Sequence, residues 1–128
     1  MDTPSVLKGV TVLVVDDHRT TRLVATLVLE KSGARVIEAP DGEAALQALA
    51  VHKVDVIVSD VEMPRLNGLG MLRMLGFPAP HPGTPPVYLH SGAPRDYAAE
   101  AASLGLALHP KADVLTALVP RLAAMMRS

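Results

Sequence analysis

The chain has 128 residues, and 12 Lys and Arg against 13 Asp and Glu give it a formal net charge of −1. Its length predicts a single domain over residues 1–128, and its balanced charge argues against nucleic acid as the main partner. The absence of cysteine excludes disulfides, zinc fingers and thiol catalysis. Residues 1–4 lack the basic start of a signal peptide, and the apolar run over residues 6–15 is far shorter than the roughly 20 residues of a membrane span. We therefore expect a soluble, cytoplasmic protein with no nucleic-acid or membrane partner.

Short aliphatic runs recur along the chain and predict strands. Several of them continue without polar alternation, which is typical of strands buried on both faces of a parallel sheet. In chain order the predicted strands cover residues 10–15, 35–39, 54–59, 87–90 and 106–108. A connector over residues 77–86 contains five prolines, so it is neither a helix nor an inner strand.

A helix pattern follows each strand. In chain order the predicted helices lie within residues 18–31, 42–49, 69–75, 97–104 and 113–126. The first shows an apolar stripe of Leu23, Val24, Leu27 and Val28. Asp41 is placed to cap the second helix. The fourth is Ala-rich, and we expect it to be short or loosely ordered. Pro120 predicts a bend or a late start in the fifth, because proline lacks the N–H of an internal helical residue.

Five strands alternating with five helices predict an α/β fold, a doubly wound (βα)5 layout around a central five-stranded parallel sheet. Ligand sites of such sheets lie at the carboxyl ends of the strands. Polar residues gather at these predicted ends: Asp16 and Asp17 after the first strand, Asp60 after the third, Ser91 after the fourth and Lys111 near the fifth.

These residue types indicate a particular chemistry. Three carboxylates repel one another unless a cation joins them, and their oxygen ligands suit Mg²⁺. A carboxylate held beside Mg²⁺ can attack phosphorus and become an acyl phosphate. A Lys ammonium can pair with a phosphoryl oxygen, and a Ser hydroxyl can donate to another. The set therefore fits a phospho-aspartate switch.

Several segments of the chain point to a known family. They are residues 14–17, 41–44, 55–60 and 63–68, together with Ser91 and Lys111. With these segments in this order, the chain resembles the receiver domain of two-component response regulators (CheY-like) over nearly its whole length. The resemblance implies a flavodoxin-like three-layer sandwich.

The resemblance also implies roles for the acidic residues. Asp60 would be the phosphoacceptor, supplied by a sensor histidine kinase or a histidine phosphotransfer protein. Asp17 would bind Mg²⁺ directly and Asp16 mostly through water. Asp60 itself would be a metal ligand, and Glu62 would offer its backbone carbonyl.

The remaining roles concern the output. Ser91 would move toward the phosphoryl group, and Lys111 would hold one of its oxygens. The face made by the fourth helix, the fifth strand and the fifth helix would then change its affinity for a downstream protein effector.

The sequence departs from the family pattern at two places. The aromatic residue expected three positions before the Lys is Leu108 here, so Leu108 or His109 takes its place or the output follows another route. The family's Pro after the Lys, which forms a cis peptide bond, is Ala112. We expect either a trans Lys111–Ala112 bond with a reshaped loop, or a cis bond held by the site against a cost of roughly 3–4 kcal/mol.

Three functions remain open at this point. The leading one is a receiver that is not itself an enzyme, either stand-alone or excised from a hybrid kinase. The second is a small Mg²⁺-dependent aspartyl phosphohydrolase with Glu62 as a second acid, although a substrate-binding cap is missing. The third is a degenerate receiver that acts as a phosphorylation-independent interaction module. The histidines show no metal-ligand spacing and are interpreted as incidental, being exposed or singly hydrogen-bonded: His18, His52, His81, His90 and His109. His18 and His90 border the predicted site, and a role in tuning it is the less favoured alternative.

Overall fold

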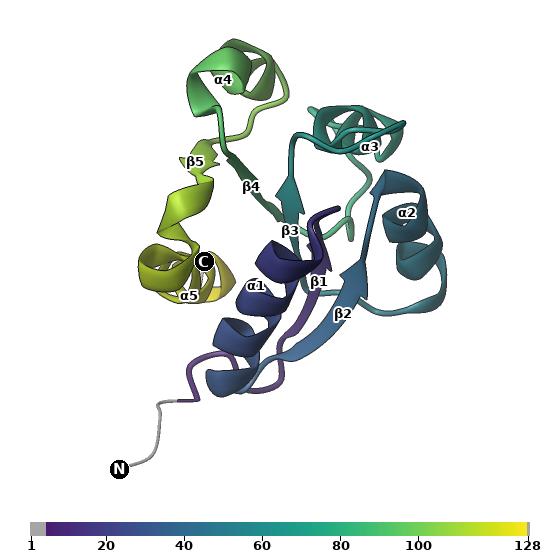
Figure 1. The fold of residues 1–128 in the computed structure, drawn as a ribbon. Helices are drawn as coiled ribbons and strands as arrows, with labels where there is room; N and C mark the ends of the chain where they lie inside the picture. The colour runs from purple at the N-terminus through teal and green to yellow at the C-terminus, as the bar shows by residue number, and fades with distance from the viewer. Residues whose placement is uncertain (1–4, 128) are drawn as a thin grey trace.

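Five parallel strands form one sheet, with the strand order β2-β1-β3-β4-β5. The computed structural model describes residues 5–127, and Figure 1 shows the sheet between two layers of helices. The strands are β1 (Thr11–Val15), β2 (Arg35–Ala39), β3 (Val56–Asp60), β4 (Val87–Ser91) and β5 (Leu108–Pro110). The predicted doubly wound (βα)5 sandwich is therefore confirmed. The prediction about a signal peptide in residues 1–4 lies outside the described residues.

The helices cover both faces of this sheet. They are α1 (Arg19–Lys31), α2 (Gly42–Val51), α3 (Gly68–Met74), α4 (Pro94–Ser103) and α5 (Val114–Arg127), and a short 3₁₀ helix, η1 (Lys111–Asp113), precedes α5. The packing of α1 and α5 buries one face, and α2, α3 and α4 cover the other (Figure 1). Among the described residues, no helix combines the length and apolarity that crossing a bilayer requires.

The alternation of side chains along β1 shows how the two cores form. Val12 and Val14 face the cluster shared with α1 and α5, whereas Leu13 and Val15 face the cluster shared with α2, α3 and α4. Because successive strand residues point to opposite faces, both faces of a central strand must be apolar. Burial of both faces of the central strands explains the uninterrupted aliphatic runs in the sequence.

The inward face of α1 differs from the predicted one. Leu23 and Leu27 are 48% and 52% exposed, and the buried residues are Ala25, Thr26 and Leu29. On the same helix the Arg22 guanidinium donates to the Asp16 carbonyl at 2.7 Å and to Glu38 at 3.0 Å. Of the predicted stripe, Val24 packs against the core, whereas the prediction was wrong for Leu23 and Leu27.

The last strand and the last helix also differ from their predicted bounds. Leu89 of β4 pairs with Leu108, and Ser91 pairs with Pro110, so β5 lies two residues later than predicted. Of the two alternatives expected at Pro120, the late start was wrong, since α5 begins at Val114 and continues through Pro120, and the bend stays a prediction. Burial of Leu118 and Leu122 against the sheet supports the helix on both sides of the proline.

Gly68 is required by a close backbone approach beside the sheet. Its N–H donates to the Val61 carbonyl at 3.0 Å. A Cβ at Gly68 would lie 2.1 Å from the Asp60 carbonyl oxygen, a distance that only backbone movement can relieve. At Gly70, by contrast, the nearest atom to an added Cβ is Leu66 Cδ1, the end of a flexible side chain, at 2.9 Å.

We predict that Gly68→Ala lowers the free energy of unfolding by about 2–4 kcal/mol, because the new methyl group displaces the Asp60 backbone. The matched Gly70→Ala variant should stay within about 1 kcal/mol of the wild type, since alanine favours the helix and Leu66 can move. Urea unfolding of the two variants measures both values. Equal stability of the two would contradict the argument.

Candidate functional site

The polar residues predicted at the strand ends lie together in the structure. Asp60 is the last residue of β3 and Ser91 the last of β4, while Asp16 follows β1 and Lys111 follows β5 directly. Parallel strands end at the same edge of their sheet, so residues far apart in the sequence meet there. The fold thus builds one acidic site from four strand ends.

The Lys111 ammonium joins two of the carboxylates. Its Nζ lies 2.9 Å from Asp60 Oδ2 and 3.1 Å from Asp16 Oδ2. The Asp60 and Asp16 side chains are 1% and 2% exposed, and a buried carboxylate needs such a partner. Among the described residues, Asp60 Oδ1 and Asp17 Oδ1 have no hydrogen-bond partner. Lys111 therefore pairs with two of the three carboxylates, and the buried Oδ1 atoms of Asp17 and Asp60 remain available to a cation.

Burial shapes the acidity of this group. It raises the pKa of Asp60 from 3.8 to about 7, although the Lys111 ammonium opposes the shift and the neighbouring Glu62 adds to it. For Lys111, burial favours the neutral amine, but Asp60 and Asp16 outweigh it and raise the pKa above its usual value. The ammonium is therefore charged, and the carboxylate beside it holds a proton more readily than an exposed one.

Glu62 contributes a side chain as well as a backbone position. The Ser91 hydroxyl donates to Glu62 Oε1 and accepts from the Ala93 N–H at 2.9 Å. Burial works against the charge on Glu62, but the hydrogen bonds from Ser91 and its other neighbours lower its pKa below the usual value. The sequence interpretation gave Glu62 only a metal-binding carbonyl or the role of an acid, so this link to Ser91 was missed.

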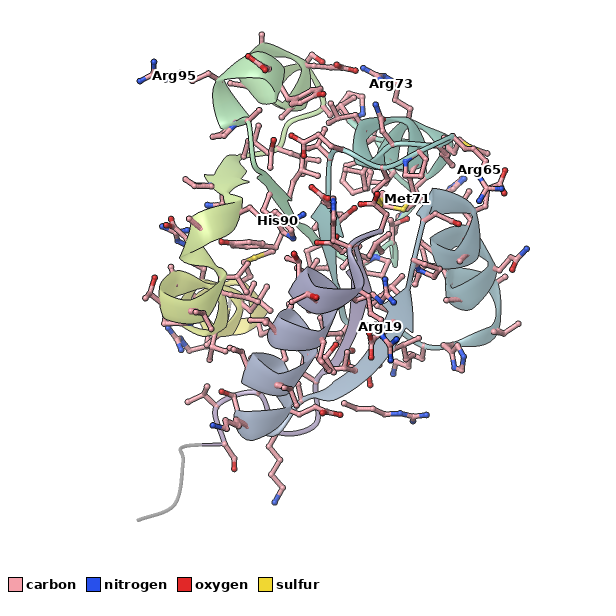
Figure 2. All side chains as sticks on the ribbon, in the orientation of Figure 1. Arg19, Arg65, Met71, Arg73, His90 and Arg95 are labelled. Atoms are coloured by element: carbon pink, nitrogen blue, oxygen red, sulfur yellow. The ribbon has the colours of Figure 1, made fainter. Side chains whose placement is uncertain are left out.

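The histidines differ more than the sequence suggested. His90 is only 1% exposed, and its Nδ1 has no partner within the described part of the chain. Figure 2 labels it inside the molecule, near β4. The His109 ring stacks on Tyr88, with ring centroids 4.2 Å apart. The interpretation of these two histidines as incidental was therefore wrong. Burial caused this difference, and the spacing of histidines in the sequence cannot reveal it.

His18 lies at the site, as the less favoured sequence interpretation had it. It belongs with Asp16, Asp17 and Asp60 to a group whose possible metal-ligand atoms all lie within 4.8 Å of one another. Its position directly after the Asp16-Asp17 pair was the available indication. A cavity of about 390 Å³, lined by Asp17, His18 and Glu62 among others, opens beside the group.

The structure shows the surroundings of the two positions near β5, Leu108 and Ala112, at which the sequence departs from the pattern expected in the sequence analysis. Leu108 packs against the core on the α2, α3 and α4 side, whereas His109 contacts Tyr88, whose hydroxyl accepts from Arg121 at 3.1 Å. The Lys111–Ala112 peptide is trans, since the only cis bond among residues 5–127 is Phe77–Pro78. The trans bond agrees with the first of the two expected alternatives, and Lys111 opens the short helix η1.

Comparison with known proteins defines the class. Residues 12–109 match the family model described as the response regulator receiver domain. The chain therefore belongs to this family, whose members are the receivers of two-component and phosphorelay signalling. Receiver domains are signalling modules with a Mg²⁺-binding acidic pocket, and the cluster of Asp16, Asp17 and Asp60 corresponds to such a pocket.

Individual relatives agree with this assignment. The sensory/regulatory protein RpfC of Xanthomonas campestris pv. campestris is 38% identical over 69 residues, which cover 54% of this chain but only 10% of RpfC. A response regulator from Thermotoga maritima is 28% identical with a TM-score of 0.73, covering 93% of this chain and 98% of that one. A CheY-like receiver domain from Methylobacillus flagellatus shares the fold with a TM-score of 0.76 at 23% identity, over 90% and 97% of the two chains.

The buried His90 predicts a dependence of stability on pH. Burial lowers its pKa from 6.5 to about 4, so the folded protein keeps the ring neutral where the unfolded chain protonates it. The contribution of the neutral His90 ring to the free energy of unfolding is fully present above about pH 6.5 and is lost as the pH falls toward 4. Relative to His90→Gln, the wild type should lose about 2 kcal/mol between pH 7 and pH 5.

Urea unfolding of both proteins at the two pH values gives this difference directly. His81→Gln serves as the matched control, because His81 is exposed and its substitution should leave the pH dependence unchanged. A wild type and His90→Gln pair with parallel pH profiles would show that the fold does not lower the pKa of His90.

Proposed function

We propose that this chain is a phosphoacceptor receiver in which Asp60 takes a phosphoryl group from a sensor histidine kinase or a histidine phosphotransfer protein. The observation that carries the proposal is that the two carboxylate oxygens of Asp60 have different surroundings. Asp60 Oδ2 is held by Lys111 at 2.9 Å, while Oδ1 is buried and has no partner within the described residues. One oxygen is fixed and the other is available to attack.

The residues present fit Mg²⁺ as the resident ion. Its preferred ligands are one or two carboxylates with water completing an octahedron, and the unpartnered Asp17 Oδ1 supplies one such ligand beside the carboxylates of Asp16 and Asp60. The Glu62 backbone carbonyl is a further proposed ligand. When bound, the ion supplies positive charge that neutralises the oxygens of a transferring phosphoryl group.

The chain's own residues then perform the transfer. Asp60 Oδ1 attacks phosphorus, the new O–P bond forms as the N–P bond of the donor phosphohistidine breaks, and the imidazole nitrogen leaves with the electron pair. Lys111 keeps the carboxylate oriented through Oδ2 and pairs with a phosphoryl oxygen afterwards. The burial that raises the Asp60 pKa to about 7 also excludes competing water contacts from this oxygen.

The structural change that follows phosphorylation would begin at Ser91. To donate to a phosphoryl oxygen, its hydroxyl must leave Glu62, and its bond from the Ala93 N–H ties it to the residue just before α4. A movement of Ser91 would therefore reach α4 first. We propose that the α4-β5-α5 face binds a downstream protein effector, with residues 1–128 acting as a single receiver domain that is not itself an enzyme.

The phosphohydrolase alternative would use Glu62 as an acid. A general acid at neutral pH needs a raised pKa, but the hydrogen bonds to Glu62 lower its pKa. The site therefore favours a stable phosphoryl acceptor over a hydrolase with Glu62 as proton donor.

Incubation with acetyl phosphate and Mg²⁺ tests the proposal. We expect intact mass to show one labile phosphoryl adduct on the wild type, and at least about a tenfold loss of it in Asp60→Asn, because the amide is a far weaker nucleophile. Asp96→Asn, at an exposed residue of α4, should keep the adduct. Chelation of Mg²⁺ should remove it.

An adduct of equal yield in Asp60→Asn would place the acceptor elsewhere. Absence of an adduct in the wild type would be followed by titration with beryllofluoride, which mimics the phosphoryl group without hydrolysis. Failure to bind it would support the degenerate receiver, and turnover of generic phosphate esters would support the hydrolase.

The Glu62 carboxylate should slow phosphorylation. It lies beside Asp60 and occupies the Ser91 hydroxyl, so its charge repels an incoming phosphoryl group. We expect Glu62→Gln to raise the rate of adduct formation about three- to tenfold, which corresponds to about 1 kcal/mol in the barrier. Glu30→Gln, on the exposed side of α1, is the matched control. A slower reaction in Glu62→Gln would mean that the carboxylate assists the transfer instead.

A further inference from the structure

Four side chains converge at the ends of β1 and β3, and one of them carries nitrogen. The possible ligand atoms of Asp16, Asp17, His18 and Asp60 all lie within 4.8 Å of one another. The three carboxylates account for the Mg²⁺ site of the proposed function. The imidazole has no part in that chemistry, so its position requires a separate explanation.

The backbone places His18 over the acidic residues. His18 is the residue before α1 in extended conformation, and its side chain makes no capping hydrogen bond to the helix. Its N–H donates to Asp16 Oδ1 at 2.8 Å, which turns the chain back toward the site. Helix capping therefore does not explain the direction of the imidazole, whose Nδ1 lies 3.1 Å from Asp17 Oδ1 and 3.7 Å from Asp16 Oδ1.

The contact between His18 and Asp17 is at ion-pair distance, and the same distance separates two ligands of one ion. Although Nδ1 is 3.1 Å from Asp17 Oδ1, that oxygen accepts no hydrogen bond within residues 5–127, so the ring N–H does not point at it. Neighbouring ligands of an octahedral ion with bonds of 2.0–2.1 Å are separated by about 3 Å. The observed separation matches this value.

A second observation concerns an unpartnered oxygen of Asp60. Asp60 Oδ1 is buried in a side chain that is 1% exposed, and no donor within the described part of the chain reaches it. Lys111 already serves Asp60 Oδ2 and Asp16 Oδ2. A cavity of about 390 Å³ is lined in part by Asp17 and His18, the two residues of the group that are open to solvent.

The identity of the donor atoms decides which ion the site prefers. Mg²⁺ takes oxygen ligands and loses its water reluctantly, whereas imidazole nitrogen suits Co²⁺, Ni²⁺ and other transition ions. We propose that His18 is a nitrogen ligand of the metal site and gives this receiver a preference for a divalent transition ion over Mg²⁺. The inference rests on the proposed function only in taking the acidic cluster as a metal site.

Calorimetric titration of the full chain with Co²⁺ and, separately, with Mg²⁺ tests the inference, without any phosphodonor. Transition ions bind most sites more tightly than Mg²⁺ does, so the informative quantity is the change caused by a variant. We expect His18→Ala to weaken Co²⁺ binding about tenfold or more and Mg²⁺ binding less than about twofold. His52→Ala, at an exposed histidine remote from the site, should change neither.

A spectroscopic reading accompanies the titration. The visible absorption of bound Co²⁺ depends on its ligands, so its spectrum should shift between the wild type and His18→Ala and stay constant in His52→Ala. His18 is 68% exposed, so its removal leaves the core intact, and thermal unfolding of the metal-free variant should match the wild type.

Two results would overturn the inference. Equal losses of Co²⁺ and Mg²⁺ affinity in His18→Ala would show a general effect on the acidic cluster, and unchanged Co²⁺ affinity with an unchanged spectrum would show that His18 does not bind the ion. Failure of the proposed function is read separately, from the Mg²⁺-dependent adduct on wild-type Asp60. Co²⁺ selectivity through His18 without such an adduct would leave this inference standing and the phosphoacceptor role refuted.

Discussion

The Lys111 ammonium between Asp60 and Asp16 is the interaction on which the arrangement of the site depends. Its two contacts, at 2.9 and 3.1 Å, join the ends of β3, β1 and β5. Two buried carboxylates without this cation would be too costly to keep ionised. The ammonium occupies one oxygen of each and leaves Asp60 Oδ1 available. The same contact that makes the acidic site stable therefore decides which oxygen remains for chemistry.

The region around β4 and β5 connects this site to α5. Ser91 ends β4, and three residues earlier in the strand Tyr88 stacks on His109 of β5. The Tyr88 hydroxyl accepts from Arg121, which also donates to Asp113 at 3.2 Å. Leu108 stands at the position of the family's usual aromatic residue, and the Tyr88–His109 pair lies on the opposite face of the sheet. A displacement of β4 would reach α5 through packed rings and hydrogen bonds.

His18 and His90 illustrate how position in the fold decides the behaviour of identical side chains. Each is adjacent in sequence to a residue of the site, but His18 is exposed to solvent, whereas His90 in β4 is buried. Burial keeps His90 neutral by lowering its pKa to about 4. Exposure leaves His18 free to offer its nitrogen to an ion. One therefore affects stability, and the other can affect ligand choice.

The sequence by itself determined the fold class, because aliphatic runs without alternation specify strands buried on both faces, and it determined which polar residues lie at the strand ends. The sequence also predicted the cap of α2 correctly, since the Asp41 side chain accepts a hydrogen bond from the Ala44 N–H. Only the tertiary structure decided the inward face of α1, the two-residue shift of β5, the Ser91–Glu62 bond and the setting of each histidine. These depend on register and on contacts between residues distant in sequence, such as Arg22 with Glu38, and no local pattern encodes them.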